Sequence, residues 1–248
     1  MSSDLVLLVV GAVIAGFVQG LSGFAFSIIA MSVWVWGVDP RLASVMAVFG
    51  SLTGQLVSAI SVRRKLHLKS LAPYLAGGLA GIPLGIVLLP LLNPDAFKLG
   101  LGVILVVWCP LMLLSPGLPR LKRGGRVADG LAGVAGGFMG GIGGLTGVIP
   151  TLWCTLRGME KDQQRALIQS FNLTILAVTM VAYVATGVVT RDMVPLLPVV
   201  ACALLIPSLL GARVFAGLSE ESFRRVVLAL LGLSGVAMLL ASLARLVS

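Results

Sequence analysis

The stretch GGFMGGIGGLTGVIP, from Gly136 to Pro150, decides how this chain can fold. It lies in an uncharged run from Gly130 to Leu156, and nine of the eighteen residues from Gly130 to Gly147 are glycine. Each glycine inside a helix costs about 1 kcal/mol relative to alanine. An apolar segment so rich in glycine therefore either packs very closely against another helix or contains a break.

Composition places the whole chain in a membrane. Hydrophobic residues make up 58% and charged residues 11% of its 248 residues, whereas soluble domains have about 45–50% apolar and about 25% charged residues. Other uncharged runs are close to the roughly 20 residues that a helix needs to cross a bilayer. These runs are Leu42–Ser61, Leu71–Pro94, Leu99–Leu118, Ala166–Thr190, Met193–Ala212 and Val226–Ala244.

Charge and cysteine patterns exclude several other classes. The formal net charge is +9, but the basic residues lie between hydrophobic runs, so membrane topology explains them better than nucleic-acid binding does. Cys109, Cys154 and Cys202 lie far apart in apolar runs without metal-ligand spacing. We therefore expect no nucleic-acid partner, no metal and no cofactor. The N-terminal segment lacks the basic start of a signal peptide, so we interpret it as a retained membrane segment.

Two uncharged runs are too long for a single span, and they resemble each other. Leu5–Val38 has 34 residues and Gly130–Leu156 has 27, which as helices would be about 51 Å and 40 Å long; the hydrocarbon core is only about 30 Å thick. GFVQGLSGFAFSII (Gly16–Ile29) aligns without gaps with GFMGGIGGLTGVIP (Gly137–Pro150). The same offset of 121 pairs further residues: Gly37 with Gly158, Asp39 with Glu160, Ser51 with Asn172, Thr53 with Thr174 and Ser58 with Thr179. Chance similarity of apolar segments is the alternative, but the polar matches favour an internal duplication.

Basic residues decide whether the two halves are parallel or inverted. If each long run were one span, the halves would be parallel, and most basic residues of the second half would lie outside, against the positive-inside tendency. If each long run is a hairpin, each half has five elements and the halves are inverted. Fourteen basic residues then lie on the cytoplasmic side: Arg63, Arg64, Lys65, Lys69, Arg120, Lys122, Arg123, Arg126, Arg157, Lys161, Arg165, Arg213, Arg224 and Arg225. The other four lie outside: Arg41, Lys98, Arg191 and Arg245.

The sequence thus predicts an all-α integral membrane protein made of two inverted repeats. Each repeat is a broken or re-entrant helical hairpin followed by three transmembrane helices. Residues 1–118 form the first repeat, 119–127 a basic cytoplasmic linker and 128–248 the second repeat, with the N-terminus outside. The arms of the first hairpin, roughly Leu5–Val18 and Ala25–Gly37, are about 14 residues each, so we expect the hairpins to meet near the membrane midplane.

A glycine-rich hairpin tip at membrane depth is a candidate anion site. Backbone there must be buried in protein or line a wet cavity, and the free N–H groups where the second arm starts attract anions. The tips are Gln19–Phe24 and Gly140–Gly147, and Ser22 and Thr146 add hydroxyl groups. Earlier glycines have a different interpretation, because small residues four apart let membrane helices pack closely. This spacing is found at Gly133, Gly137 and Gly141.

Polar side chains form a stripe along the helix that follows each hairpin. Ser44, Ser51, Gln55 and Ser58 share one face, and so do Gln169, Asn172 and Thr179. Amides in membrane helices usually face a bundle interior; whether these line a site or bond between helices is left open by the sequence. The predicted substrate-binding residues are Gln19, Gly20, Ser22, Gly23, Phe24, Ser51, Gln55, Gly141, Gly143, Gly144, Thr146, Gln169 and Asn172.

The remaining titratable residues do not suggest an enzyme. All nine acidic residues lie at segment ends, so no embedded carboxylate presents itself as an ion relay. His67 lies in a basic loop, and the glycine-rich tip has no lysine at the P-loop position. A neutral, donor-rich interior suits an anion better than a cation, and we expect no catalytic residues.

These segments resemble a known family. GFVQGLSGFAFSIIA and GGFMGGIGGLTGVIP are similar to the two signature segments of the sulfite exporter TauE/SafE family, also called the 4-toluene sulfonate uptake permease family, and VDPRLASVMAVFGS and MEKDQQRALIQSFN resemble its following helices. The second signature of that family commonly has a proline where Pro150 stands; the first often has one as well, but this chain has IIAMSVW there. The resemblance implies a multi-pass carrier of the bacterial inner membrane, working without ATP on small sulfur-containing anions such as sulfite, a sulfonate or sulfoacetate.

The function predicted from residues and resemblance together is therefore secondary transport of a small sulfur-containing anion. An anion channel of the same architecture and a non-transporting membrane scaffold are the alternatives. The expected partners are the anion and the lipid bilayer. Protons are the candidate coupling ion and a homodimer is the candidate assembly, and the sequence decides neither, nor the direction of transport.

Overall fold

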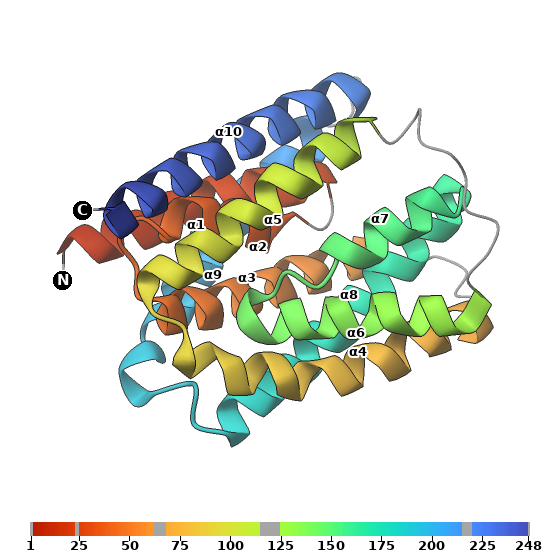
Figure 1. Cartoon of the computed structure of the whole chain (residues 1–248), viewed down its shortest axis with the longest axis horizontal. Coiled ribbons are helices and arrows are strands. Elements are labelled where there is room, and N and C mark those ends of the chain that lie inside the picture. Colours follow the sequence, from red (N-terminus) through yellow and green to blue (C-terminus); the bar gives the residue numbers. More distant parts are fainter. Residues whose placement is uncertain (1, 23–24, 62–67, 115–124, 215–219, 248) are drawn as a thin grey trace.

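The computed structural model describes residues 2–22, 25–61, 68–114, 125–214 and 220–247, and within these ranges the chain is helical without a strand. The helices of the first half are α1 (Ser2–Ser22), α2 (Phe26–Trp34), α3 (Pro40–Ser61), α4 (Leu68–Leu88) and α5 (Pro94–Leu114), with the 3-10 turn η1 (Leu89–Leu91) between the last two. Those of the second half are α6 (Gly125–Gly143), α7 (Val148–Leu156), α8 (Lys161–Ala185), α9 (Leu196–Val214) and α10 (Glu220–Val247), with η3 (Arg191–Met193) before α9. Figure 1 shows them as one elongated bundle.

Both long uncharged runs are broken into hairpins. The two charged residues that flank the second run, Asp129 and Arg157, form an ion pair at 2.6 Å. In one continuous helix they would lie about 42 Å apart. The chain therefore reverses between α6 and α7, and it reverses in the same way between α1 and α2 (Figure 1).

The arms of each hairpin are unequal, so the prediction of two arms of about 14 residues is wrong. In the first hairpin α1 has 21 residues and α2 has nine; in the second, α6 has 19 and α7 has nine. The first arm is long enough to cross a bilayer and the second is not. After the first short arm, the Asp39 carboxylate caps the next helix by accepting hydrogen bonds from the N–H groups of Arg41 and Leu42, with Pro40 at the first helical position.

Glycine faces bring α4 and α6 into close contact along their length. Gly77, Gly81 and Gly85 of α4 and Gly133, Gly137 and Gly141 of α6 point at the backbone of the opposite helix. A methyl group on Gly77 would lie 1.9 Å from the Gly130 carbonyl oxygen, and one on Gly137 would lie 1.9 Å from that of Gly78. The packing role predicted for Gly133 and Gly137 is confirmed, and it extends to Gly141.

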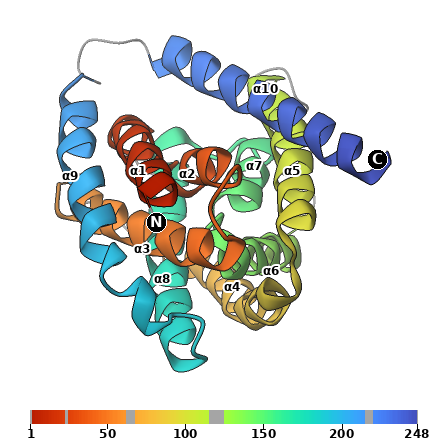
Figure 2. The same ribbon diagram turned by 90° about the vertical axis from the view of Figure 1, so that its left-hand side faces the viewer.

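The most extensive helix contacts join the two halves of the chain. α4 of the first half packs along α6, α9 of the second half packs along α1, and α5 packs along α10. α3 and α8 also contact each other. Viewed along the bundle, α1, α2 and α7 lie near the middle, with α9 and α10 toward the outside (Figure 2). Under the expected correspondence of the halves, the α1–α9 contact is the counterpart of the α6–α4 contact.

The surface is apolar and the interior contains polar groups, as a membrane requires. Large hydrophobic side chains are exposed around the bundle, for example Val87 at 69%, Val181 at 69% and Leu233 at 68%. Five helices in the described residues are long and apolar enough to cross a membrane. Conversely, Gln19, Ser51, Gln55 and Asn172 are buried. These spans indicate a multi-pass membrane protein.

Basic residues gather at one end of the bundle among the described ranges. The starts of α4, α6 and α8 and the end of α7 lie together there (Figure 1). These ends include Lys69, Arg126, Arg157, Lys161 and Arg165. The starts of α3 and α5, with Arg41 and Lys98, lie at the opposite end. The predicted cytoplasmic residues 63–65 and 120–123 fall outside the described residues. α6 begins at Gly125, within the range expected for the linker.

Candidate functional site

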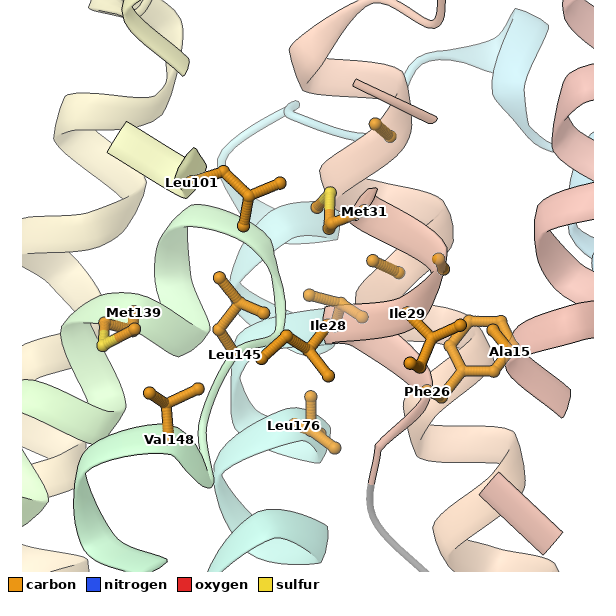
Figure 3. Packing of buried hydrophobic residues seen from close by; sticks show 14 of the residues in the cluster. Ala15, Phe26, Ile28, Ile29, Met31, Leu101, Met139, Leu145, Val148 and Leu176 are labelled. Atoms are coloured by element: carbon orange, nitrogen blue, oxygen red, sulfur yellow. The ribbon is translucent and has the colours of Figure 1, made fainter. Parts of the chain in front are cut away.

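The tips of the two hairpins meet inside the bundle. Gly144, at the end of α6, lies against Ser27 in the first turn of α2: a methyl group on Gly144 would be 2.6 Å from Ser27 Oγ. Figure 3 shows Leu145 beside Ile28, with Met31, Val148 and Leu176 farther away in the same cluster. All five of these apolar side chains are buried. The contact between the tips is therefore closed and lined by apolar groups.

The first tip is held by a side-chain amide. Gln19 is 1% exposed, and its Oε1 accepts a hydrogen bond of 3.0 Å from the N–H of Phe26, the first residue of α2. It thus satisfies one of the backbone donors that every helix start leaves without a partner in the helix. Gly54 of α3 makes room for Gln19, since a methyl group there would lie 2.8 Å from Gln19 Cγ.

Hydroxyl groups connect the first tip to α3. Ser27 Oγ forms a hydrogen bond with Ser51 Oγ and donates to the carbonyl oxygen of Ala47 at 3.3 Å. Both serines are buried, at 4% exposure. Because Gly144 lies against Ser27, the predicted binding residues Ser51 and Gly144 come within one side chain of each other.

The second tip ends α6 with a glycine in the left-handed region. Gly144 has φ of +71°, which only glycine adopts readily. Its N–H donates to the Gly140 carbonyl at 2.8 Å, and the Leu145 N–H donates to the Met139 carbonyl at 3.3 Å. These two donors close the helix end and point back along α6. Gly143 packs against Met31 of α2.

The following residues supply donors without acceptors. Within the described part of the chain, no hydrogen bond is made by the backbone N–H of Thr146, Gly147 or Ile149, at the start of α7. Thr146 Oγ1 donates to Asn172 Oδ1 at 2.9 Å and orients that amide, whose Nδ2 lies beside Gly147. Thr146 and Asn172 are both 2% exposed. Three backbone N–H groups and one amide NH₂ thus lie near the N-terminus of α7, where the helix dipole favours negative charge.

The other predicted residues lie in different places. Gly141 faces Ile82 of α4, on the packing side of α6. Gly20 and Ser22 belong to the last turn of α1, and Gly23 and Phe24 lie outside the described residues. Gln55 is buried on α3 next to Gly54, while Gln169 is half-buried on α8, one turn from Asn172.

A second polar cluster joins the open end of the α6–α7 hairpin to α4. Asp129 of α6 is 6% exposed. Its Oδ1 accepts from Tyr74 Oη at 3.0 Å, from Trp153 Nε1 at 2.8 Å and from Arg157 Nη1 at 2.6 Å, and Arg157 Nη1 also lies 2.8 Å from Oδ2. The hydrogen bonds to Asp129 raise the pKa of the Arg157 guanidinium above its usual value. The Asp129 carboxylate is therefore buried and hydrogen-bonded to three side chains.

Comparison with protein families gives one match. The family described as Sulfite exporter TauE/SafE matches residues 8–238, a range that includes both hairpins. The chain belongs to the sulfite exporter TauE/SafE family. No curated protein and no solved structure matches it.

Membership of the TauE/SafE family confirms the resemblance and indicates a membrane permease for sulfur-containing anions. It also bears on the departure noted in the first hairpin. Pro150 lies in the first turn of α7 and has no N–H to donate, whereas its counterpart Ile29 donates to the Ala25 carbonyl at 3.2 Å. In this TauE/SafE chain the two hairpins are therefore not chemically equivalent at their tips.

The sequence interpretation missed the pair of Asp129 and Arg157, which it treated as segment-end charges. A signal was present: these two residues bound the uncharged run from Gly130 to Leu156. Once that run is predicted to be a hairpin, its flanking residues must lie at the same end of the molecule. Opposite charges at the two ends of a hairpin predict an ion pair.

Proposed function

We propose that this TauE/SafE protein is a secondary transporter of the bacterial inner membrane that moves a small sulfur-containing anion, such as sulfite, a sulfonate or sulfoacetate. No chemical step and no ATP are needed. The anion binds at the tip of the α6–α7 hairpin, near the membrane midplane. The observation that carries this proposal is that the N–H groups of Thr146, Gly147 and Ile149, next to the Asn172 amide, have no acceptor among the described residues.

Physical chemistry supports this placement. A partly buried N–H group without an acceptor costs free energy unless a ligand or water satisfies it. An oxyanion supplies several acceptor oxygens at once, and an uncharged interior strengthens its attraction to the N–H dipoles. Ser27 and Ser51 of the other hairpin and α3 lie across the tip contact, but their hydroxyl hydrogens are already used in bonds to the Ala47 carbonyl oxygen and between the two serines. The first tip contributes less, because Gln19 already occupies the Phe26 N–H.

The closed contact between the tips favours a carrier over an open channel. Gly144 and Ser27 leave no room for a methyl group between them, and their chain neighbours Leu145 and Ile28 are buried beside each other. An anion reaches the donors only if the hairpins move apart. Inverted-repeat transporters bind substrate at broken helices near the repeat interface and expose the site by rocking one unit against another. We propose the same inverted relation for the halves, with the N-terminus outside.

The test is uptake of radiolabelled sulfite into proteoliposomes by the purified protein. Asn172→Asp puts a carboxylate beside the proposed anion. Two unit charges at about 4 Å repel by roughly 4 kcal/mol at an effective dielectric constant near 20, so we expect kcat/KM for sulfite to fall at least a hundredfold. A carrier also predicts saturable uptake at rates far below channel flux.

Asn93→Asp is the matched control. This variant makes the same asparagine-to-aspartate change at an exposed site. Asn93 Oδ1 accepts a hydrogen bond from the Ala96 N–H at 2.7 Å, and an aspartate at this position caps α5 equally well. Uptake by this variant should equal that of the wild type. Normal uptake by a folded Asn172→Asp variant would contradict binding of the anion at the α7 tip. Absence of flux for sulfite, sulfonates and sulfoacetate in the wild type would favour a scaffold.

A further inference from the structure

A basic pocket lies at the open end of the α6–α7 hairpin, away from the tip. Its volume is about 240 Å³, and it is formed by the start of α4, the start of α6 and the residues after α7. The lining includes three basic side chains, Lys69, Arg126 and Arg157, and one acidic side chain, Asp129. Three positive charges against one negative charge leave the pocket strongly electropositive.

The single carboxylate offsets only one of the three cations, because it is paired with Arg157. Asp129 accepts from Tyr74, Trp153 and Arg157. Arg157 uses the same nitrogen, Nη1, for both of its contacts with the carboxylate, and its side chain is 34% exposed. An arginine held in this way presents the rest of its planar fork to the pocket in a fixed direction.

The other two cations have no ionic partner. Lys69 and Arg126 are exposed, and neither forms an ion pair within the described parts of the chain. Ser70 adds a hydroxyl group to the same lining. The volume is below the roughly 300–1,000 Å³ of pockets for drug-sized ligands, so the pocket suits a small ion with a few waters.

We propose that this pocket binds a small tetrahedral or pyramidal oxyanion through Lys69, Arg126 and Arg157. The same chemistry is offered by a free sulfur oxyanion and by the phosphate of an anionic lipid. The α7 helix has nine residues, about 14 Å in length, so the pocket lies one short helix away from the tip donors. Its role as the cytoplasmic loading or release site of the carrier rests on the proposed function, whereas oxyanion binding itself does not.

Binding is measured with radiolabelled sulfite on the full chain in phosphatidylcholine nanodiscs. The Asn172→Asp background removes the tip site, so the remaining sulfite binding reports the pocket. Adding Lys69→Gln and Arg126→Gln should weaken that binding at least tenfold. Adding Arg165→Gln and Arg213→Gln instead removes two basic side chains from other helix ends and should leave the affinity within twofold.

A parallel arm identifies the natural source of the anion. Nanodiscs with phosphatidylglycerol are compared with phosphatidylcholine alone, and lipids retained by the protein are counted by native mass spectrometry. Phosphatidylglycerol retention that falls in the Lys69→Gln/Arg126→Gln variant, together with sulfite binding that phosphatidylglycerol suppresses, assigns the pocket to a lipid phosphate. Sulfite binding unaffected by phosphatidylglycerol assigns it to the free anion.

The proposal is overturned if neither sulfite nor phosphatidylglycerol binds in a way that the Lys69→Gln/Arg126→Gln variant weakens, or if the control variant weakens binding equally. Failure of the proposed function has a different signature. In that case the wild type transports no sulfur anion, while sulfite binding in the Asn172→Asp background persists and still depends on Lys69 and Arg126.

Discussion

In the α1–α2 hairpin, the first N–H of the short helix donates to the Gln19 side chain. In the α6–α7 hairpin, by contrast, the N–H groups of Thr146, Gly147 and Ile149 have no acceptor in the described residues. The start of α2 is capped at Phe26 by a side chain of its own hairpin, whereas α7 has no side-chain cap. Under the proposed function, the second hairpin supplies the donors that bind the anion and the first contributes less.

The open ends of the two hairpins also differ, in the group that accepts a tryptophan hydrogen bond. Leu8 and Asp129 are counterparts at the offset of 121, and each accepts a hydrogen bond from a tryptophan indole N–H of the short arm. Trp34 Nε1 donates to the Leu8 carbonyl at 3.2 Å, and Trp153 Nε1 donates to the Asp129 carboxylate at 2.8 Å. The second hairpin therefore adds a charge to a contact that the first makes through a backbone carbonyl.

The largest expected effect comes from the counterpart glycines Gly16 and Gly137. A methyl group on Gly137 lies 1.9 Å from a carbonyl oxygen of α4, whereas one on Gly16 lies 2.7 Å from the Leu204 carbonyl of α9. Overpacking costs about 1–3 kcal/mol, so Gly137→Ala should lower the free energy of unfolding by about 3 kcal/mol and Gly16→Ala by less. Thermal unfolding in detergent measures both.

Gly100 of α5 is the control for this pair. No heavy atom lies within 4 Å of the position that a methyl group on Gly100 would take, so Gly100→Ala meets open space. This variant should gain up to about 1 kcal/mol from helix propensity. Equal unfolding temperatures for Gly137→Ala and Gly100→Ala would contradict the close contact of α4 with α6.

The next largest effect compares the polar contacts that hold the open ends of the two hairpins together. Arg157→Leu leaves the buried Asp129 carboxylate without its ion-pair partner, and breaking a buried pair costs up to about 3–5 kcal/mol. Because Arg157 is 34% exposed, we expect about 2 kcal/mol after allowance for solvent screening. Trp34→Phe removes one neutral hydrogen bond, worth about 1 kcal/mol. Unfolding in denaturant, monitored by circular dichroism, ranks the two; a larger loss for Trp34→Phe would reverse the comparison.

The smallest effect tests the division of tasks at the tips. Gln19→Met keeps the side-chain length but removes the acceptor for the Phe26 N–H, at a cost of about 1 kcal/mol in stability. Sulfite KM should stay within twofold of the wild type, since this tip is already capped. A tenfold rise in KM, measured by uptake into proteoliposomes with folded protein, would make Gln19 a substrate ligand after all.

The breaks in both long uncharged runs could be predicted from length and charge. A run of 34 residues is too long for one span, and unbroken runs would place most arginines of the second half outside the membrane. The packing role of Gly133 and Gly137 followed from their spacing of four. The arm lengths could not be predicted, since they depend on Asp39 capping α3 and on Gly144 ending α6 with a positive φ. Both helix ends are determined by capping contacts and backbone conformation rather than by hydrophobic periodicity.

The site was predictable only in outline. Thr146, Asn172 and Gly144 were among the predicted residues, and the structure brings them together with Ser27 and Ser51. Gly141 was predicted both to share the packing spacing of Gly133 and Gly137 and to bind substrate, and its position on the helix points it at α4. Which glycines face a neighbour and which end a helix depends on where that helix stops, and sequence alone did not locate that residue.

The exchange of helices between the halves has a consequence for how such a chain is assembled. α6 finds its close-packed partner in α4, and α1 finds its partner in α9, so each half leaves a strip of bare main chain that only the other half covers. Residues 1–118 synthesised alone would keep the contact of α1 with α2 but would leave the Gly16 face of α1 uncovered. Under the proposed inverted relation of the halves, an ancestor with a single copy of the unit would have needed a second, inverted copy beside it to cover that face.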